Sequence, residues 1–190
     1  MNHDAQNRLL SLASRQLGIS GLYWFLASEA ALFGGLCLAV VYLRAGSDDW
    51  SNAAAHLSSG TAIVATALLV AAAGFLRKGS TRDGDGSVPW LVASLAAGLG
   101  FLALKTLDFH GHWTEGFRPE VSVFWASYFL LTGLHAVHVA AGVIVCGWLT
   151  WRIWCRPAWP AGQVWLWGTR LYWYFVDAVW LSLLCLFYLG

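Results

Sequence analysis

Five long apolar stretches, separated by short polar segments, make up most of this sequence. They cover about residues 21–43, 57–76, 88–109, 124–151 and 169–189. Each provides the roughly 20 predominantly apolar residues that an α-helix needs to cross about 30 Å of hydrocarbon. The pattern therefore predicts an all-α fold, an integral membrane bundle of five transmembrane helices.

The segments outside these stretches are polar, and they set the expected domain organisation. Residues 77–87 read RKGSTRDGDGS, a linker rich in Gly, Ser and charge. Residues 1–20 place Arg8 and Arg15 among spaced leucines, which predicts a short amphipathic segment in the cytoplasm or at the membrane surface. We expect residues 21–190 to form a single five-helix membrane domain.

Composition supports a membrane protein. Of 190 residues, 58% are hydrophobic and 11% are charged, whereas soluble domains carry about a quarter charged residues. The basic residues are dispersed, which argues against a nucleic-acid partner. The four cysteines have no CxxC spacing, so we expect them to act as small apolar residues in packed helices. The tryptophan-rich connector around Trp159 is typical of a membrane interface.

Lysine and arginine are unevenly divided between alternate polar segments, and this predicts the orientation. Two basic residues, Arg44 and Arg118, fall on one side, and Lys105 lies within a span. Eight fall on the other side: Arg8, Arg15, Arg77, Lys78, Arg82, Arg152, Arg156 and Arg170. By the positive-inside rule the N-terminus is cytoplasmic and the C-terminus lies outside.

The ionisable residues at membrane depth carry the candidate chemistry. They are Glu29, Lys105, Asp108, His135, His138 and Asp177. His135 and His138 share one face of their helix because they are three residues apart. The same spacing predicts that Lys105 pairs with Asp108 near the outer surface. We expect Glu29 to be buried and Asp177 to hydrogen-bond to one of the two histidines.

Four interpretations compete for these groups. A bis-histidine heme is disfavoured because both intramembrane histidines lie on one helix. A metal site is the second interpretation, because four residues that can ligate metals lie in or next to a predicted loop at residues 110–120, but their spacing matches no zinc pattern. These ligands are Asp108, His110, His112 and Glu115. A proton or ion pathway through Glu29 and His138 is chemically possible, since acids and imidazoles relay protons. The sequence favours an interhelical hydrogen-bond cluster, because it lacks the repeats and broken helices typical of transporters.

Three stretches follow patterns that occur in the same order in one known family. They read LASEAALFGG at residues 26–35, TGLHAVHVAAG at residues 132–142 and YWYFVDAVWL at residues 172–181. These resemble the (M/I)SExx(F/L)FxG(F/L), TGxHGxHVxxG and YWHFVDxVWLxL segments of subunit III of the heme-copper respiratory oxidases, the cytochrome c and quinol oxidases. The resemblance runs from about residue 21 to the C-terminus and implies the five-helix short form of that family.

The resemblance implies a counterpart for each polar residue. Glu29 corresponds to the membrane-embedded carboxyl known in the family for carbodiimide reactivity. His135 and His138 correspond to its histidine pair, and Asp177 to the aspartate of its last helix. Asp108, in KTLDF, resembles the acid of the family's QxSEY segment.

Three positions depart from the family pattern, and one of them is Asp108, which is one methylene shorter than the family's Glu. Tyr174 stands where the family usually has His, and Lys105 stands where it has Gln. We expect Tyr174 to belong to an interhelical polar cluster. The members of this cluster are Thr132, His135, His138, Tyr174 and Asp177. These departures leave open an accessory role beside a nitric oxide reductase.

The resemblance also implies the function. It implies a non-catalytic accessory subunit of a cytochrome c or quinol oxidase complex in a bacterial inner membrane, supporting the stability and proton uptake of the catalytic subunit. The expected partners are heme-copper subunit I, other oxidase subunits and membrane lipids. No cofactor or metal is expected on this chain, but a structural phospholipid is. A small membrane transporter or proton channel remains the alternative from another class.

Overall fold

The computed structural model describes residues 3–47, 50–81, 86–156 and 162–188, with side chains from residue 16 onward. The predictions that concern Arg82 and Trp159 lie outside these residues. The described helices are α1 (His3–Ala45), α2 (Trp50–Ala54), α3 (Ser59–Ser80), α4 (Val88–Thr114), α5 (Val123–Cys155) and α6 (Gly162–Tyr188). All except α2 are long and apolar enough to cross a membrane, which confirms the predicted all-α bundle of five spans.

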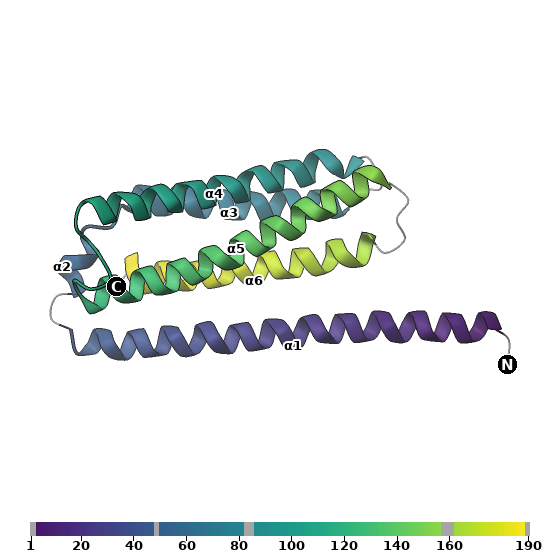
Figure 1. Cartoon of the computed structure of the whole chain (residues 1–190), viewed down its shortest axis with the longest axis horizontal. Coiled ribbons are helices and arrows are strands. Elements are labelled where there is room, and N and C mark those ends of the chain that lie inside the picture. Colours follow the sequence, from purple (N-terminus) through teal and green to yellow (C-terminus); the bar gives the residue numbers. More distant parts are fainter. Residues whose placement is uncertain (1–2, 48–49, 82–85, 157–161, 189–190) are drawn as a thin grey trace.

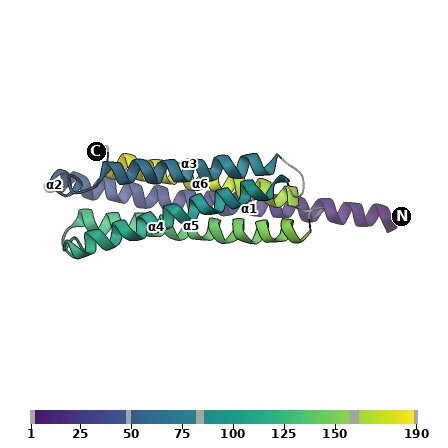
Figure 2. The same ribbon diagram turned by 90° about the horizontal axis from the view of Figure 1, so that it is seen from above.

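The N-terminal helix is continuous across the boundary expected near residue 20. In α1 the membrane-crossing part covers Gln16–Ala45, and the helix itself begins at His3. Its N-terminal end runs past the ends of the other long helices in Figures 1 and 2. The assignment of residues 1–20 to the cytoplasm or the membrane surface stays a prediction.

The fourth helix ends later than the hydrophobic pattern indicated. The sequence placed residues 110–120 in a loop, but α4 continues through His112. Two backbone hydrogen bonds close the helix, from Gly116 N–H to Trp113 O at 3.3 Å and from Phe117 N–H to His112 O at 2.9 Å. Gly116 has a φ of 90°, so this is a Schellman C-cap that requires glycine. The loop prediction was wrong at its start because the glycine, not the first polar residue, ends the helix.

Helices α3, α4, α5 and α6 form a closed group, in which α3 packs against α4 and α6, and α5 packs against α4 and α6. Helix α1 lies along one side of this group, against α5 and α6 (Figure 1). Only 11% of the apolar window of α1 is buried inside the chain, against 33–39% for the other spans. Helix α1 is therefore the peripheral span, and polar contacts carry more of its attachment.

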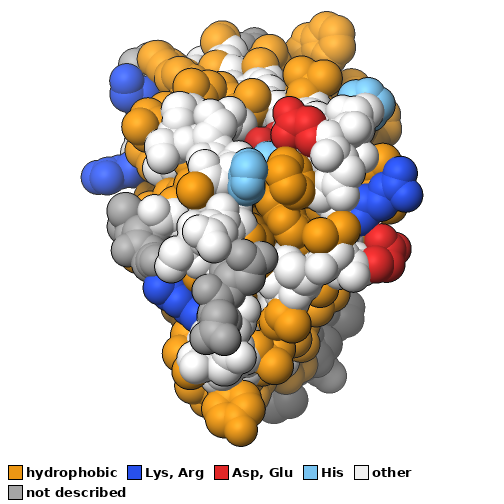
Figure 3. All heavy atoms as spheres, turned by 90° about the vertical axis from the view of Figure 1, so that its left-hand side faces the viewer, with side chains coloured by type: hydrophobic (Ala, Val, Ile, Leu, Met, Phe, Trp, Pro, Cys, Tyr) orange, Lys and Arg blue, Asp and Glu red, His pale blue; other side chains and the backbone are white. Residues whose placement is uncertain are grey.

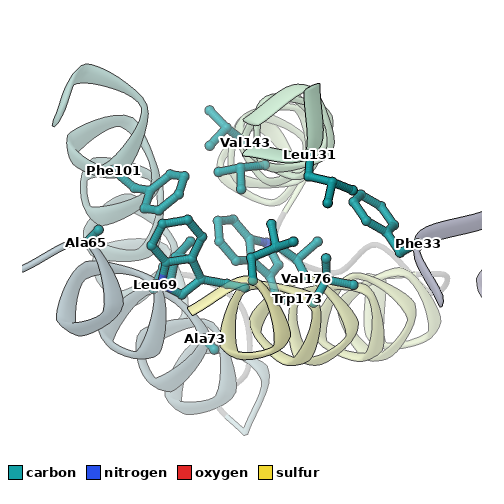
Figure 4. Packing of buried hydrophobic residues seen from close by; sticks show 14 of the residues in the cluster. Phe33, Ala65, Leu69, Ala73, Phe101, Leu131, Val143, Trp173 and Val176 are labelled. Carbon is teal, nitrogen blue, oxygen red and sulfur yellow. The ribbon is translucent and has the colours of Figure 1, made fainter. Parts of the chain in front are cut away.

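Aromatic side chains fill the interior between the helices. Figure 4 shows Phe101 of α4, Leu131 of α5 and Trp173 of α6 converging on the same space, with Phe33 reaching in from α1. Trp173 and Phe101 are fully buried. Because lipid tails are as apolar as these side chains, dispersion contacts between well-packed surfaces hold such helices together.

Hydrogen bonds between helices add to this packing. Ser94 Oγ of α4 donates to the Ala72 carbonyl of α3 at 2.8 Å. Trp180 Nε1 of α6 donates to Thr66 Oγ1 of α3 at 3.0 Å. Such bonds contribute on average about 0.6 kcal/mol in a membrane bundle, so they fix helix register more than they determine stability.

Helices α4, α5 and α6 pack tightly around Gly98. A Cβ added there would lie 2.7 Å from Val143 Cγ2 and 2.9 Å from the Trp173 ring. We expect Gly98→Ala to lower the free energy of unfolding by about 1–3 kcal/mol through overpacking. Dodecyl sulfate titration of the purified chain in mild detergent measures this. Gly74→Ala is the matched control, because no atom lies within 4 Å of its added Cβ; equal effects would contradict the packing.

Candidate functional site

A hydrogen bond between a carboxyl group and an imidazole joins α1 to α5 near the middle of the membrane-crossing helices. Glu29 Oε2 lies 3.0 Å from His138 Nε2, and the two side chains are 19% and 13% exposed. The other ring nitrogen, Nδ1, lies 2.8 Å from the carbonyl oxygen of Leu134, one turn earlier on α5. Glu29, which the sequence predicted to be buried, is thus half-buried and paired with the second of the two histidines.

These contacts fix the proton content of the pair. A carbonyl oxygen only accepts hydrogen bonds, so the Nδ1 of His138 carries a hydrogen that it donates to Leu134. A hydrogen bond between Nε2 and the Glu29 carboxyl then requires one further proton between them. Whichever atom holds this proton, the pair is neutral overall. That neutrality removes most of the several kcal/mol that an isolated charge would cost in hydrocarbon.

Aromatic residues and one tyrosine hydroxyl surround the pair. The Phe33 ring meets the His138 ring edge-on at a centroid distance of 5.1 Å, and it also contacts Phe175 at 6.4 Å. Tyr172 of α6 donates its hydroxyl hydrogen to the His138 carbonyl oxygen at 2.9 Å. Helices α1, α5 and α6 therefore meet at His138, and we call Glu29, His138 and Tyr172 the α1 clamp.

His135 does not join the α1 clamp. Its ring is buried, stacked on Trp180 at 5.4 Å and edge-on to Phe101 at 5.7 Å, and neither ring nitrogen has a hydrogen-bond partner among the described residues. Thr132 hydrogen-bonds within α5 to the carbonyl oxygen of Tyr128. The two histidines face different surroundings, one aromatic and one polar.

The remaining members of the predicted cluster also lie apart. Asp177 Oδ1 is buried without a hydrogen-bond partner among the described residues, so the expected bond to His135 or His138 is not formed. Tyr174 is 42% exposed, and it does not share a helix face with Tyr172 because the two are only two residues apart. The sequence predicted a single interhelical cluster, but the structure has the α1 clamp and other polar residues that lie apart from it. The rotation of each helix about its own axis decides which partner each side chain meets.

A second polar cluster ties α4, α5 and α6 together toward the α2 end of the bundle. Lys105 Nζ donates to Asp108 Oδ2 at 2.7 Å and to the Tyr128 hydroxyl at 2.8 Å, and Tyr128 donates to Asp108 Oδ2 at 2.7 Å. The Tyr188 hydroxyl of α6 lies 3.4 Å from that of Tyr128. Lys105 is only 2% exposed and also faces the ring of Trp180 at 5.6 Å.

Sequence reasoning placed Lys105 beside Asp108, but it missed the two tyrosines. The sequence did contain a signal for them, because Tyr128 and Tyr188 lie near the ends of their spans that are on the same side of the membrane as Lys105 and Asp108. A buried ammonium and carboxylate need further hydrogen-bond partners beyond each other. Hydroxyl groups on neighbouring helices supply them here.

The potential metal ligands at the end of α4 and in the following turn do not form a metal site. Among the described residues, no group of three or more His, Cys, Asp or Glu side chains has an arrangement that would hold a metal ion. His112 lies 3.6 Å from Asp108 but is buried among aromatic rings, whereas His110 is exposed. Figure 3 views this end of the molecule, where charged and histidine side chains lie among apolar ones.

The fold and these clusters define the class of protein. Five apolar helices of membrane-crossing length, joined by paired polar groups, make this chain a multi-pass membrane protein. The sequence model of the family described as "Cytochrome c oxidase subunit III" matches residues 51–190, and the chain belongs to this family. It is an accessory type of subunit of the heme-copper oxidases, and its partners are other oxidase subunits.

Individual relatives agree with the family. A "Probable quinol oxidase subunit 3" of Staphylococcus haemolyticus is 27% identical over 199 aligned residues, which cover 100% of this chain and 96% of the relative. A protein of the same description from Staphylococcus epidermidis is 27% identical over 197 residues, with the same coverage. A "Cytochrome bo(3) ubiquinol oxidase subunit 3" of Pseudomonas putida is 33% identical over 104 residues, 55% of this chain and 50% of the relative. Glu29 lies outside the family match but within the two full-length alignments.

The α1 clamp predicts energetic coupling between Glu29 and His138. In a double-mutant cycle with Glu29→Gln and His138→Ala, we expect a coupling of about 1 kcal/mol in the free energy of unfolding, because the two residues share one proton and one hydrogen bond. Denaturation of the purified chain in detergent measures each variant. The control cycle pairs Glu29→Gln with a substitution of exposed His110. Additive effects in the Glu29 and His138 cycle would mean that the pair does not hold α1.

The second cluster predicts an asymmetry between single and double variants. Asp108→Asn leaves the buried Lys105 ammonium without its carboxylate, so we expect a loss of about 3 kcal/mol or more in the free energy of unfolding. Replacing both residues, with Lys105→Met and Asp108→Leu, removes the unpaired charge and restores part of that loss. The same unfolding titration compares the three proteins. A double variant less stable than Asp108→Asn would refute a buried, mutually dependent pair.

Proposed function

We propose that this chain is the third subunit of a quinol-oxidising heme-copper terminal oxidase in a bacterial cell membrane. The family match over residues 51–190 carries this proposal. The quinol branch is supported by the relatives with full-length alignments, whose names describe quinol oxidase subunits. In this proposal the chain packs beside the catalytic subunit I and contributes no redox centre of its own.

The orientation follows from the distribution of basic residues. The N-terminus lies in the cytoplasm and the C-terminus lies outside, since eight of ten extramembrane Lys and Arg residues fall in alternate segments that begin with the N-terminus. The end of the bundle that carries α2 and the turn between α4 and α5 then faces outward. In this orientation Lys105 and Asp108 lie toward the outer end.

The subunit supports the catalytic subunit in two ways. Its rigid group of four helices provides a fixed packing surface. The α1 clamp holds one proton between Glu29 and His138, and both side chains keep some exposure at the edge of the chain. A carboxyl and imidazole pair of this kind exchanges protons with nearby water, and in this way the clamp aids proton uptake by the neighbouring subunit. The subunit also holds structural phospholipid between its helices.

Purification from native membranes tests the proposal. A tagged chain solubilised in mild detergent should bring down a heme-bearing subunit, visible in the reduced-minus-oxidised spectrum. The complex should consume oxygen faster with a quinol than with reduced cytochrome c. A complex that lacks this subunit should lose activity faster during turnover, because the catalytic subunit then lacks its lateral support.

Three results would contradict this function. Purification without any heme-bearing partner would contradict the proposal that the chain is part of an oxidase complex. Reduction of nitric oxide without oxygen consumption would assign the chain to a nitric oxide reductase complex. Transport activity of the lone chain in liposomes would favour a transporter or proton channel.

A further inference from the structure

One acid at membrane depth has a buried oxygen that the rest of the chain leaves unbonded. Asp177 lies near the middle of α6, and its Oδ1 has no hydrogen-bond partner among the described residues. Glu29 and Asp108, the other acids of the described spans, each pair with a side chain of this chain. A buried oxygen without a donor is costly, most of all at membrane depth. The packing of this chain therefore does not account for an acid at this position.

Asp177 faces the junction of α6 with α3. One helical contact lies before it, where Arg170 Nη1 donates to Ser80 Oγ of α3 at 3.1 Å. The other lies after it, where Trp180 Nε1 donates to Thr66 Oγ1 of α3 at 3.0 Å. Steps of seven and three residues keep Asp177 on the same side of the helix as Arg170 and Trp180. The carboxyl group is thus directed toward α3, between these two contacts.

Helix α3 offers this carboxyl group no donor. Residues 67–76, which lie between the two contacts, read ALLVAAAGFL and have no polar side chain. The one hydroxyl hydrogen of Thr66 is already donated to the Ala62 carbonyl oxygen at 2.7 Å. The backbone N–H groups within a helix are used by the helix itself. Asp177 is also only half-buried, so a group from a neighbouring molecule can reach it.

The surface beside Asp177 has the form of a helix-docking face. Both helices expose a stripe of four residues with the spacing i, i+4, i+7 and i+11. These stripes are Ile63, Ala67, Val70 and Gly74 on α3, and Tyr174, Ala178, Leu181 and Cys185 on α6. Three of the eight residues are Ala or Gly, and a Cβ added to Gly74 would meet no atom within 4 Å. Small residues allow a neighbouring helix to approach closely. We call these two stripes and Asp177 the α3/α6 face.

We propose that the α3/α6 face docks a membrane-crossing helix of the heme-bearing subunit, and that this helix donates a side-chain hydrogen bond to the Asp177 carboxyl group. The inference rests on the proposed function and names the face and the chemistry of the contact. The acceptor on this face selects a partner with a donor at the same depth. Lipid acyl chains have no donor, so lipid at this face leaves the acid unpaired. The Tyr174 side chain, 42% exposed, adds a phenol to the same contact surface.

Photo-cross-linking in native membranes tests the location of the face. A benzoylphenylalanine replaces Leu181, one turn from Asp177, in the tagged chain, and mass spectrometry identifies the cross-linked protein. The expected product joins Leu181 to the heme-bearing subunit. Val137 of α5 is the matched control, since it is an apolar side chain that is 65% exposed. Helix α5 lies across the core from the junction of α3 and α6 (Figure 4), so the control position should give no such product.

Substitution of Asp177 tests the hydrogen bond. The tagged chain is titrated with oxidase depleted of this subunit, and heme retained on the tag is measured. Asp177→Leu should weaken binding about tenfold, because a hydrogen bond to a charged or strongly polar group is lost. Asp177→Asn keeps an acceptor oxygen and should bind with intermediate affinity. Thr106→Leu is the matched control, since it removes an exposed hydroxyl that bonds to its own helix at Leu102.

The stability of the isolated chain separates docking from a structural role. Asp177→Leu should leave the unfolding midpoint in detergent unchanged or raise it, because the acid has no partner to lose within the described chain. A lower midpoint together with weaker binding would mean that Asp177 supports the fold, and this would overturn the proposal.

The remaining outcomes are equally decisive. Cross-links from Val137 but not from Leu181 to the heme-bearing subunit would overturn the α3/α6 face and leave the proposed function standing. A cross-link from Leu181 to a second copy of this chain, or to lipid alone, would do the same. Unchanged binding of Asp177→Leu would overturn the hydrogen bond. Absence of any heme-bearing partner from the purified wild-type chain would overturn the proposed function and this inference together.

Discussion

The pairing of Glu29 with His138 is the interaction on which the position of α1 depends. Helix α1 buries little of its own apolar surface inside the chain, and Gly34 and Gly35 have no neighbouring atoms within 4 Å of an added Cβ. Its packing contacts are limited to a few buried side chains, such as Phe33 and Val40. Separation of α1 from α5 would leave a carboxyl and an imidazole unpaired at membrane depth, which costs kilocalories. The polar pair therefore adds to the limited packing of α1.

Some ionisable residues of the bundle are paired, such as Glu29 with His138 and Lys105 with Asp108. His135 and Asp177 lie apart from these pairs. The Lys105 ammonium has a carboxylate and a tyrosine hydroxyl as partners. His135, with no hydrogen-bond partner among the described residues, lies among aromatic rings that tolerate a neutral imidazole. The arrangement is that of a packing subunit whose polar residues fix helix register.

Much of this fold was predictable from the sequence, because membrane-crossing helices are encoded by run length alone. Residues 124–151 gave a span that the structure extends to Val123–Cys155. Pairing between residues on one helix, such as Lys105 and Asp108, was also readable, since i, i+3 spacing fixes their proximity. Pairing between residues on different helices could not be read from the sequence. Asp177 and Glu29 had equivalent expected depths, but only the rotation of each helix decides which acid meets His138.

An experimental structure of the assembled oxidase would show the α1 clamp and the partner subunit together. We expect Glu29 Oε2 and His138 Nε2 to lie within hydrogen-bond distance of each other, at about 3.0 Å, with the chain packed against a heme-bearing subunit. Glu29 turned away from His138 and paired with a residue of another subunit would contradict it.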